Sequence, residues 1–203
     1  MLFSAKKTLQ ETSSEELILM LSKGNSSAFN ELYRRFSLRI LNYLLHMLGG
    51  NSAKAQDILQ DVFLRVIEKA DSFRPQYKAV SWLYVIAGNL CKNEYRRSGR
   101  MLHMSKDNFD SLGFENSAGS SSAMESLDKE KFEEALYKKL YQLPPEHRSI
   151  FLLRFQQELS VKEIADIMAC PEGTVKSRLH YTVKKLAGSL QAYNPQHNIN
   201  TGP

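Results

Sequence analysis

The chain has 203 residues, enough for one large domain or two small ones. Its 27 lysines and arginines outnumber its 22 acidic residues, and the resulting net charge of +5 is too modest to identify a polyanionic partner by itself. No segment is long and apolar enough to span a membrane, and no apolar run follows Lys6 and Lys7 as it would in a signal peptide. We therefore expect a cytoplasmic protein.

The first half of the chain consists of segments with helical periodicity, and none shows convincing strand alternation. Ser13 followed by Glu16 is a capping box, which predicts a short helix that ends near Gly24. Three longer helices are predicted to follow: 26–48, stopped by two glycines, 52 to about 70, and 79–97. We expect these four helices to bury a common core.

The third predicted helix has a wide apolar face that runs from Ile58 to Ile67, and an acidic face opposite. Leu64 falls on the acidic face, between Asp61 and Glu68. A leucine among acids is typical of a contact with a basic protein. Single surface leucines are also common, so the residues alone favour a solvated face.

Aromatic and basic residues cluster around the start of the fourth helix: Phe73, Arg74, Tyr77, Lys78, Trp82 and Tyr84. Aromatic rings stack on unpaired bases and cations neutralise the phosphates, so this mixture indicates single-stranded nucleic acid. Trp82 is more plausibly a core residue. Further along, Asn89 begins a polar side that continues to Arg96 and could face DNA.

A stretch rich in serine, glycine and asparagine, 98–126, predicts a flexible linker. Residues 105–134 hold eight acids and three lysines, so we expect this acidic stretch to be disordered in the free protein. A second helical domain is predicted over 127–190, with helices at 130–142 and 146–157 before a helix-turn-helix, and a frayed tail over 191–203. The predicted fold class is thus all-α, with two small helical domains joined by a linker.

The helix-turn-helix begins with a second capping box, Ser160 and Glu163, and Pro171 suits the first position of the next helix. That helix should bury one apolar stripe: Val175, Leu179, Val183 and Leu186. Between 174 and 189 it carries four basic residues and no acid. A helix that is apolar on one side and cationic on the other suits the phosphate-lined major groove of DNA.

The sequence contains no phosphate-binding glycine loop and no nucleophile–base constellation. Cys91 and Cys170 are far apart and lack metal-ligand spacing. We therefore expect no catalytic residue, no metal, no cofactor and no small-molecule substrate.

Four motifs occur in a characteristic order: AQDILQDVFLRV, SWLYVIAGN, LPPEHRSIFLLRF and SVKEIADIMACPEGTVKSRL. Together they resemble those of bacterial sigma factors, and more narrowly the extracytoplasmic-function (ECF) group of the sigma-70 family. The resemblance spans about residues 10 to 190. It implies a non-enzymatic alternative sigma factor that binds core RNA polymerase and directs promoter recognition, DNA melting and transcription initiation.

The resemblance also assigns roles, with 1–97 as sigma region 2 and 127–190 as sigma region 4. One set matches the helix that docks on the clamp coiled coil of the largest polymerase subunit, which reverses the solvated-face interpretation: Asp57, Gln60, Asp61 and Leu64. A second set matches the positions that capture flipped bases of the −10 non-template strand: Phe73, Arg74, Tyr77 and Asn89. A third set matches the positions that read the −35 duplex: Arg154, Lys176, Ser177, His180 and Tyr181.

His180 and Tyr181 are not typical residues at their positions, so the −35 sequence is left open. The resemblance further implies an anti-sigma factor, often membrane-bound, that would hold the chain at the inner membrane. From the net charge of −5 over residues 105–134, we further predict that the linker threads the positively charged RNA exit path of the polymerase complex as a mimic of RNA. Two rivals fit the residues alone: a ligand-sensing regulator that binds duplex DNA without polymerase, and, more remotely, an enzyme with an appended DNA-binding domain.

Overall fold

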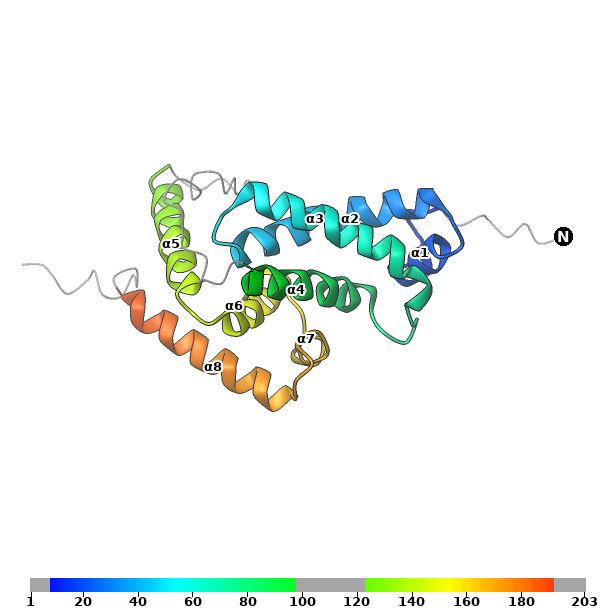
Figure 1. The fold of residues 1–203 in the computed structure, drawn as a ribbon. Coiled ribbons are helices and arrows are strands. Elements are labelled where there is room, and N and C mark those ends of the chain that lie inside the picture. The colour runs from blue at the N-terminus through cyan, green and yellow to red at the C-terminus, as the bar shows by residue number, and fades with distance from the viewer. Residues whose placement is uncertain (1–7, 98–122, 192–203) are drawn as a thin grey trace, which may run out of the picture. The chain divides into compact units, whose positions relative to one another are not determined.

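The computed structural model describes residues 8–97 and 123–191 (Figure 1). Every regular element in these two ranges is helical, so the all-α prediction is confirmed. The chain divides into two compact units, with α1 to α4 in the first and α5 to α8 in the second. Most of the predicted linker, 98–122, and the tail after 191 lie outside the described residues.

The first unit begins where the local signals predict. Its elements are α1 (Ser14–Leu21), α2 (Ser26–Met47), α3 (Ser52–Lys69), the 3₁₀ turn η1 (Ala70–Ser72) and α4 (Ala79–Arg97). Ser13 and Glu16 form the expected capping box of α1, and the Asn25 side chain caps α2 by accepting a hydrogen bond from the Ala28 N–H. After Leu48, the C-cap of α2, Gly49 and Gly50 take positive φ angles of 66° and 81°, a conformation that favours glycine and ends the helix.

The core of the first unit draws on all four helices, because α1 packs on α2, α2 on α3 and α3 on α4. The side chains of Leu17, Leu32 and Leu83 are completely buried. The rings of Tyr43 and Tyr84 meet edge to face, with centroids 5.3 Å apart. Each buried leucine stabilises the fold by about 1.5–3 kcal/mol relative to an exposed one, so the unit is a firm platform for its exposed faces.

The second unit contains α5 (Ala123–Tyr141), α6 (Pro145–Phe151), the π-helical turn η3 (Leu152–Gln156), α7 (Val161–Met168) and α8 (Glu172–Ser189). The start of α5 lies inside the predicted linker. Five of the eight acids of 105–134 therefore fall on a helix, and the prediction of disorder is wrong for this part. Alanine, leucine, glutamate and lysine dominate from Ala123 onward, and their helix propensity outweighs the nearby serines.

The helix-turn-helix forms as predicted, with two local differences. The Ser160–Glu163 capping box is present, and Ala169 closes α7 with a left-handed φ of 49°. Pro171 is the N-cap of α8 and not its first residue. Val183, predicted to be buried, is 42% exposed, whereas Thr182 is fully buried.

Thr182 tolerates burial because its hydroxyl has hydrogen-bonding partners. It donates to the Arg178 carbonyl at 2.8 Å, and His147 Nδ1 lies 3.1 Å from its oxygen. The buried side of α8 packs on α6 and α7 through residues such as Val175 and Leu186. The opposite side of α8 is therefore left open to solvent.

Candidate nucleic-acid and protein interfaces

The outer face of α3 carries all four residues predicted to bind polymerase. Asp57, Gln60 and Asp61 are exposed, and Leu64 is 56% exposed. Their spacing of three and four residues places them on one side of the helix. The other side is buried in the first unit. The result is an apolar contact point among carboxylates, which suits a protein surface with an apolar spot beside cations.

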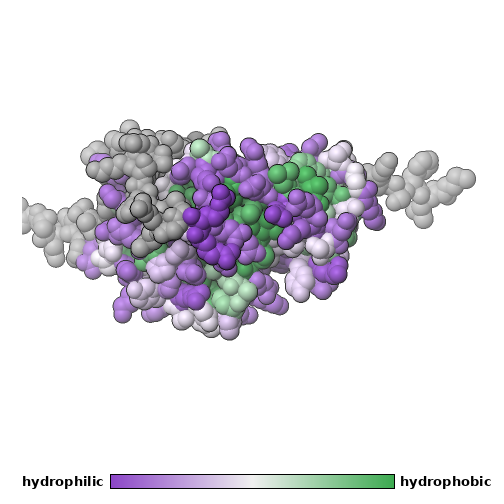
Figure 2. Space-filling model, in the orientation of Figure 1, coloured by the Kyte–Doolittle hydropathy of each residue, from purple (hydrophilic) through white to green (hydrophobic). Residues whose placement is uncertain are grey.

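Next to this face lies an apolar area that the sequence did not predict. Ile67, expected in the buried stripe, is 48% exposed, and Tyr33 of α2 is 44% exposed. The Tyr33 ring packs on the ring of Phe63 with centroids 4.7 Å apart. Figure 2 shows hydrophobic residues among hydrophilic ones over α2 and α3. The pairing of Tyr33 with an α3 residue could not be read from either helix alone.

The loop between η1 and α4 exposes two of its three predicted DNA contacts. Arg74 is exposed and Tyr77 is 55% exposed. The turn that carries them is closed by a 3.0 Å hydrogen bond from the Tyr77 N–H to the Arg74 carbonyl. A cation and an aromatic ring on one turn can contact a phosphate and stack on an unpaired base.

Phe73 corrects the sequence interpretation of this loop. Its side chain is only 3% exposed, and its ring meets the ring of Trp82 at 5.3 Å. A buried ring cannot stack on a base while it occupies this position. Trp82, which the sequence assigned to the core, is partly buried, and Tyr84, which the sequence placed in the same aromatic cluster, is fully buried.

Beyond the loop, α4 presents the expected polar side. Asn89 is exposed, as are the polar residues that follow it: Lys92, Asn93 and Arg96. The Arg96 guanidinium donates a hydrogen bond to the Asn93 side chain. These groups supply amide donors and acceptors beside positive charge, the combination that contacts bases and phosphates.

The exposed side of α8 gathers four of the five predicted −35 contacts: Lys176, Ser177, His180 and Tyr181. The Ser177 hydroxyl donates to the Thr174 carbonyl at 3.1 Å, so its lone pairs remain available as acceptors. The Tyr181 ring is 50% exposed and lies edge-on to His147, with centroids 5.2 Å apart. This face can donate to and accept from base edges in a groove.

Arg154 comes from a different element, the π-helical turn η3. Its side chain is exposed, and its Nη1 donates to the carbonyl of Leu159 at 2.9 Å. The guanidinium thus steadies the loop that leads into α7. Its remaining N–H groups could also reach a phosphate, because an arginine carries five donors.

His147 was missed by the sequence analysis, and no local pattern marks it. It sits on α6 and contacts α8 through Thr182 and Tyr181. Burial, followed by the charge of Arg178, lowers the pKa of His147 below its ordinary value. The shift favours the neutral imidazole, whose ring packs edge-on against the exposed Tyr181 ring.

Two family models match the chain: sigma-70 region 2 over residues 32–101, and sigma-70 region 4 over residues 133–186. The chain belongs to the sigma-70 family. An ECF RNA polymerase sigma-E factor from Haemophilus influenzae is 27% identical over 188 residues, which cover 90% of this chain and 97% of the relative. This sigma factor is thus of the ECF group: it acts with RNA polymerase in promoter recognition and transcription initiation, and it is not an enzyme.

Two solved structures share the fold. CnrH in complex with the cytosolic domain of CnrY has a TM-score of 0.64 at 21% identity, covering 89% of this chain and 99% of that chain. The sigma factor RpoE from Bartonella quintana, in complex with the anti-sigma factor NepR, has a TM-score of 0.62 at 24% identity, covering 80% and 96%. In this sigma factor, none of the helices within 8–97 and 123–191 is both long and apolar enough to cross a membrane.

Proposed function

We propose that the sigma factor divides promoter recognition between its two units. The first binds core polymerase and the −10 strand, and the second reads the −35 duplex. The proposal is supported by the different chemistry of the exposed faces: α3 offers carboxylates around Leu64, whereas the open side of α8 offers basic and polar groups and no acid between 174 and 189. An acidic face repels DNA and attracts a basic protein, and a cationic face does the reverse.

Docking on polymerase uses Asp57, Gln60, Asp61 and Leu64, and their partner is the clamp coiled coil of the largest subunit. Replacing Asp61 with arginine and Leu64 with alanine should weaken core binding and leave the helical circular dichroism unchanged. Leu38→Ala is a matched control, because Leu38 on α2 is 57% exposed, as Leu64 is at 56%. If the native protein, the double variant and Leu38→Ala bound core polymerase equally well, the α3 face would be a solvated surface and not a docking site.

At the −10 element, Arg74, Tyr77 and Asn89 hold unpaired bases of the non-template strand. Phe73 now has a supporting role, because its ring is buried. Extracting a base costs a few kcal/mol, and stacking returns about 1–3 kcal/mol per base. Melting is therefore close to balance and sensitive to sequence.

At the −35 element, α8 enters the major groove with its exposed residues toward the bases. Lys176, Ser177, His180 and Tyr181 supply the groove contacts, and Arg154 supplies a phosphate contact. A base-edge contact discriminates by about 1–3 kcal/mol, whereas a phosphate contact adds affinity without sequence preference.

An anti-sigma factor is the proposed regulator. Two of the similar solved structures are complexes, one of CnrH with the cytosolic domain of CnrY and one of the sigma factor RpoE with the anti-sigma factor NepR. A partner of this kind would cover the polymerase-binding face of α3. The sigma factor would then work in the cytoplasm and be held at the inner membrane whenever its partner is membrane-bound.

Residues 98–122, between the two units, are proposed to follow the path of the nascent RNA. They hold three acids and two basic residues, so most of the acidity expected of the linker belongs to α5. Neutralising Asp107, Asp110 and Glu115 should change promoter escape without changing −35 binding. Unchanged promoter escape in this variant would contradict the proposed role of residues 98–122.

Run-off transcription with core polymerase on a promoter library tests the proposed function as a whole. A sigma factor should direct transcription from a defined subset of promoters and should co-purify with the core enzyme. A duplex-binding regulator should do neither, and it should bind DNA equally well without polymerase.

A further inference from the structure

The N-terminus of α4 is capped from a distance by α1. Ala79, the first residue of α4, donates its N–H to Glu15 Oε1 at 2.8 Å, across 64 residues of sequence. The first N–H groups of a helix have no partner within the helix and need an outside acceptor. The preceding residue, Lys78, has no side-chain acceptor, and the first turn of α4 contains no acid. Glu15 therefore supplies both the acceptor and the negative charge that a helix N-terminus favours.

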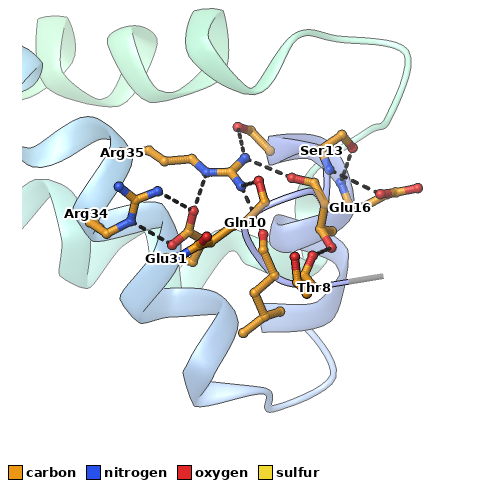
Figure 3. A network of polar contacts seen from close by, with 10 residues as sticks. Thr8, Gln10, Ser13, Glu16, Glu31, Arg34 and Arg35 are labelled. Atoms are coloured by element: carbon orange, nitrogen blue, oxygen red, sulfur yellow. Dashed lines mark hydrogen bonds and ion pairs between the residues drawn. The ribbon is translucent and has the colours of Figure 1, made fainter. Parts of the chain in front are cut away.

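The position of Glu15 is itself fixed, because hydrogen bonds join the segment before α1 to α2. The Arg35 guanidinium donates hydrogen bonds to five acceptors: the carbonyls of Leu9, Gln10 and Thr12, the Ser14 hydroxyl and the Glu31 carboxylate. Figure 3 shows the Arg35 side chain reaching from α2 into this N-terminal turn. Glu31 also pairs with Arg34 at 2.8 Å, and these hydrogen bonds lower the pKa of Glu31 to about 2.

Helix α1, which Arg35 ties to α2, contacts both ends of the −10 loop. Besides the cap on α4, α1 packs against η1, the turn from which the loop departs. The loop itself, 73–78, carries the exposed Arg74 and Tyr77. Helix α1 thus holds both ends of the loop in place, while the exposed side chains in its middle can contact DNA.

We propose that Glu15 is a positioning residue for −10 recognition, acting through the N-terminus of α4 on the loop that presents Arg74 and Tyr77. The inference rests on the proposed −10 role of that loop. Loss of the cap lets the first turn of α4 fray, and the two exposed side chains then lose their fixed relation to Asn89. Glu15 touches no base, so its effect is on the geometry of capture.

The test uses holoenzyme assembled from core polymerase and full-length variants on a duplex promoter obtained from the library. Glu15→Ala removes the acceptor and should lower open-complex formation about two- to thirty-fold, the range expected for a lost cap, and should flatten base preference at −10. Glu15→Gln keeps an oxygen acceptor and should stay within about two-fold of the native chain. Core affinity and −35 duplex affinity should be unchanged in both.

Three further variants separate the possible explanations. Glu16→Ala breaks the capping box of α1 itself and should not alter −10 base preference; an equal loss in Glu16→Ala and Glu15→Ala would overturn the inference, and so would an unchanged Glu15→Ala. If Glu15→Ala does not fold, Glu15→Asp takes its place, because its side chain is one methylene shorter and should weaken the 2.8 Å hydrogen bond to the Ala79 N–H. Tyr77→Ala tests the −10 role of the loop separately. If Tyr77→Ala melted the promoter normally, the −10 role of the loop would be refuted. If Tyr77→Ala showed a melting defect and Glu15→Ala did not, only the inference about Glu15 would be refuted.

Discussion

The ring of Phe73 meets the ring of Trp82 at an interplanar angle of 63°, with 5.3 Å between the centroids. This contact ties the loop 73–78 to the first turn of α4. It also separates two aromatic residues of one loop, because Phe73 is 3% exposed and Tyr77 is 55% exposed. The first stabilises the loop and the second is available to DNA.

This separation predicts two different mutant phenotypes. Phe73→Ala should lower the free energy of unfolding by about 3 kcal/mol, as expected for a buried phenylalanine. Tyr77→Ala should change it by less than about 0.5 kcal/mol and should reduce promoter melting. Urea denaturation and 2-aminopurine fluorescence at −10 measure the two quantities. A stable Phe73→Ala protein with a melting defect would show that Phe73 leaves the core to contact DNA.

His147 and Tyr181 predict an energetic coupling across two helices. Thr182 donates its hydroxyl hydrogen to the Arg178 carbonyl, so His147 Nδ1–H donates to the Thr182 oxygen, and the imidazole is fixed edge-on to Tyr181. A double-mutant cycle of His147→Ala and Tyr181→Ala, read as −35 duplex affinity, should give a coupling of about 0.5–1.5 kcal/mol. His180→Ala combined with His147→Ala is the control. Additive losses in the first pair would mean that His147 does not position Tyr181.

Local signals predicted the fold well because they act within a few residues. Both capping boxes, at Ser13 and at Ser160, form as expected, and α4 has its predicted limits, 79–97. The start of α5 was predicted too late in the sequence. Serine-rich composition is a property of a whole stretch of residues, whereas the start of a helix depends on individual residues. Thr182 replaced Val183 in the core because its hydroxyl is satisfied by residues of α6 and α8.

The interfaces were harder to predict than the helices. Helical spacing alone put Leu64 and Lys176 on exposed faces, and both are exposed. The burial of Phe73 depends on Trp82, and the cap on Ala79 depends on a residue 64 positions away. Such contacts are set by packing between elements, which periodicity within one element does not report.

A buried histidine makes the stability of the first unit sensitive to acid. Burial lowers the pKa of His46 on α2 to about 4, from an ordinary value of 6.5. Because the folded-state pKa is depressed, the unfolded state binds more protons between pH 6.5 and 4. The free energy of unfolding therefore has its full value above pH 6.5, and it falls by up to about 3 kcal/mol as the pH drops from 6.5 to 4.

Fluorescence of Trp82, the only tryptophan in the chain, follows unfolding of the unit that contains His46. His46→Leu should abolish most of the stability change between pH 6.5 and 4. Glu31 titrates lower, since the pKa of its carboxyl is about 2, so its contribution is lost only as the pH falls below about 4.5. An unchanged pH profile in His46→Leu would show that another group controls acid unfolding.

The two proposed DNA sites should fail in different ways. Lys176 lies on the exposed side of α8, so Lys176→Ala should weaken −35 binding, and the defect should ease at low salt because a phosphate or base-edge contact is lost. Asn89 is exposed on α4, in the other unit, so Asn89→Ala should leave −35 binding intact and impair melting.

A template that is already mismatched at −10 separates these defects. It supplies the unpaired bases without the cost of melting, so it should rescue Asn89→Ala much more than Lys176→Ala. Permanganate footprinting on matched and mismatched templates, at two salt concentrations, measures the rescue. Lys92→Ala is a suitable control for Asn89→Ala, because Lys92 is exposed on the same helix and its loss should follow salt and not the mismatch. Equal rescue of Asn89→Ala and Lys176→Ala would contradict the division of labour between the two units.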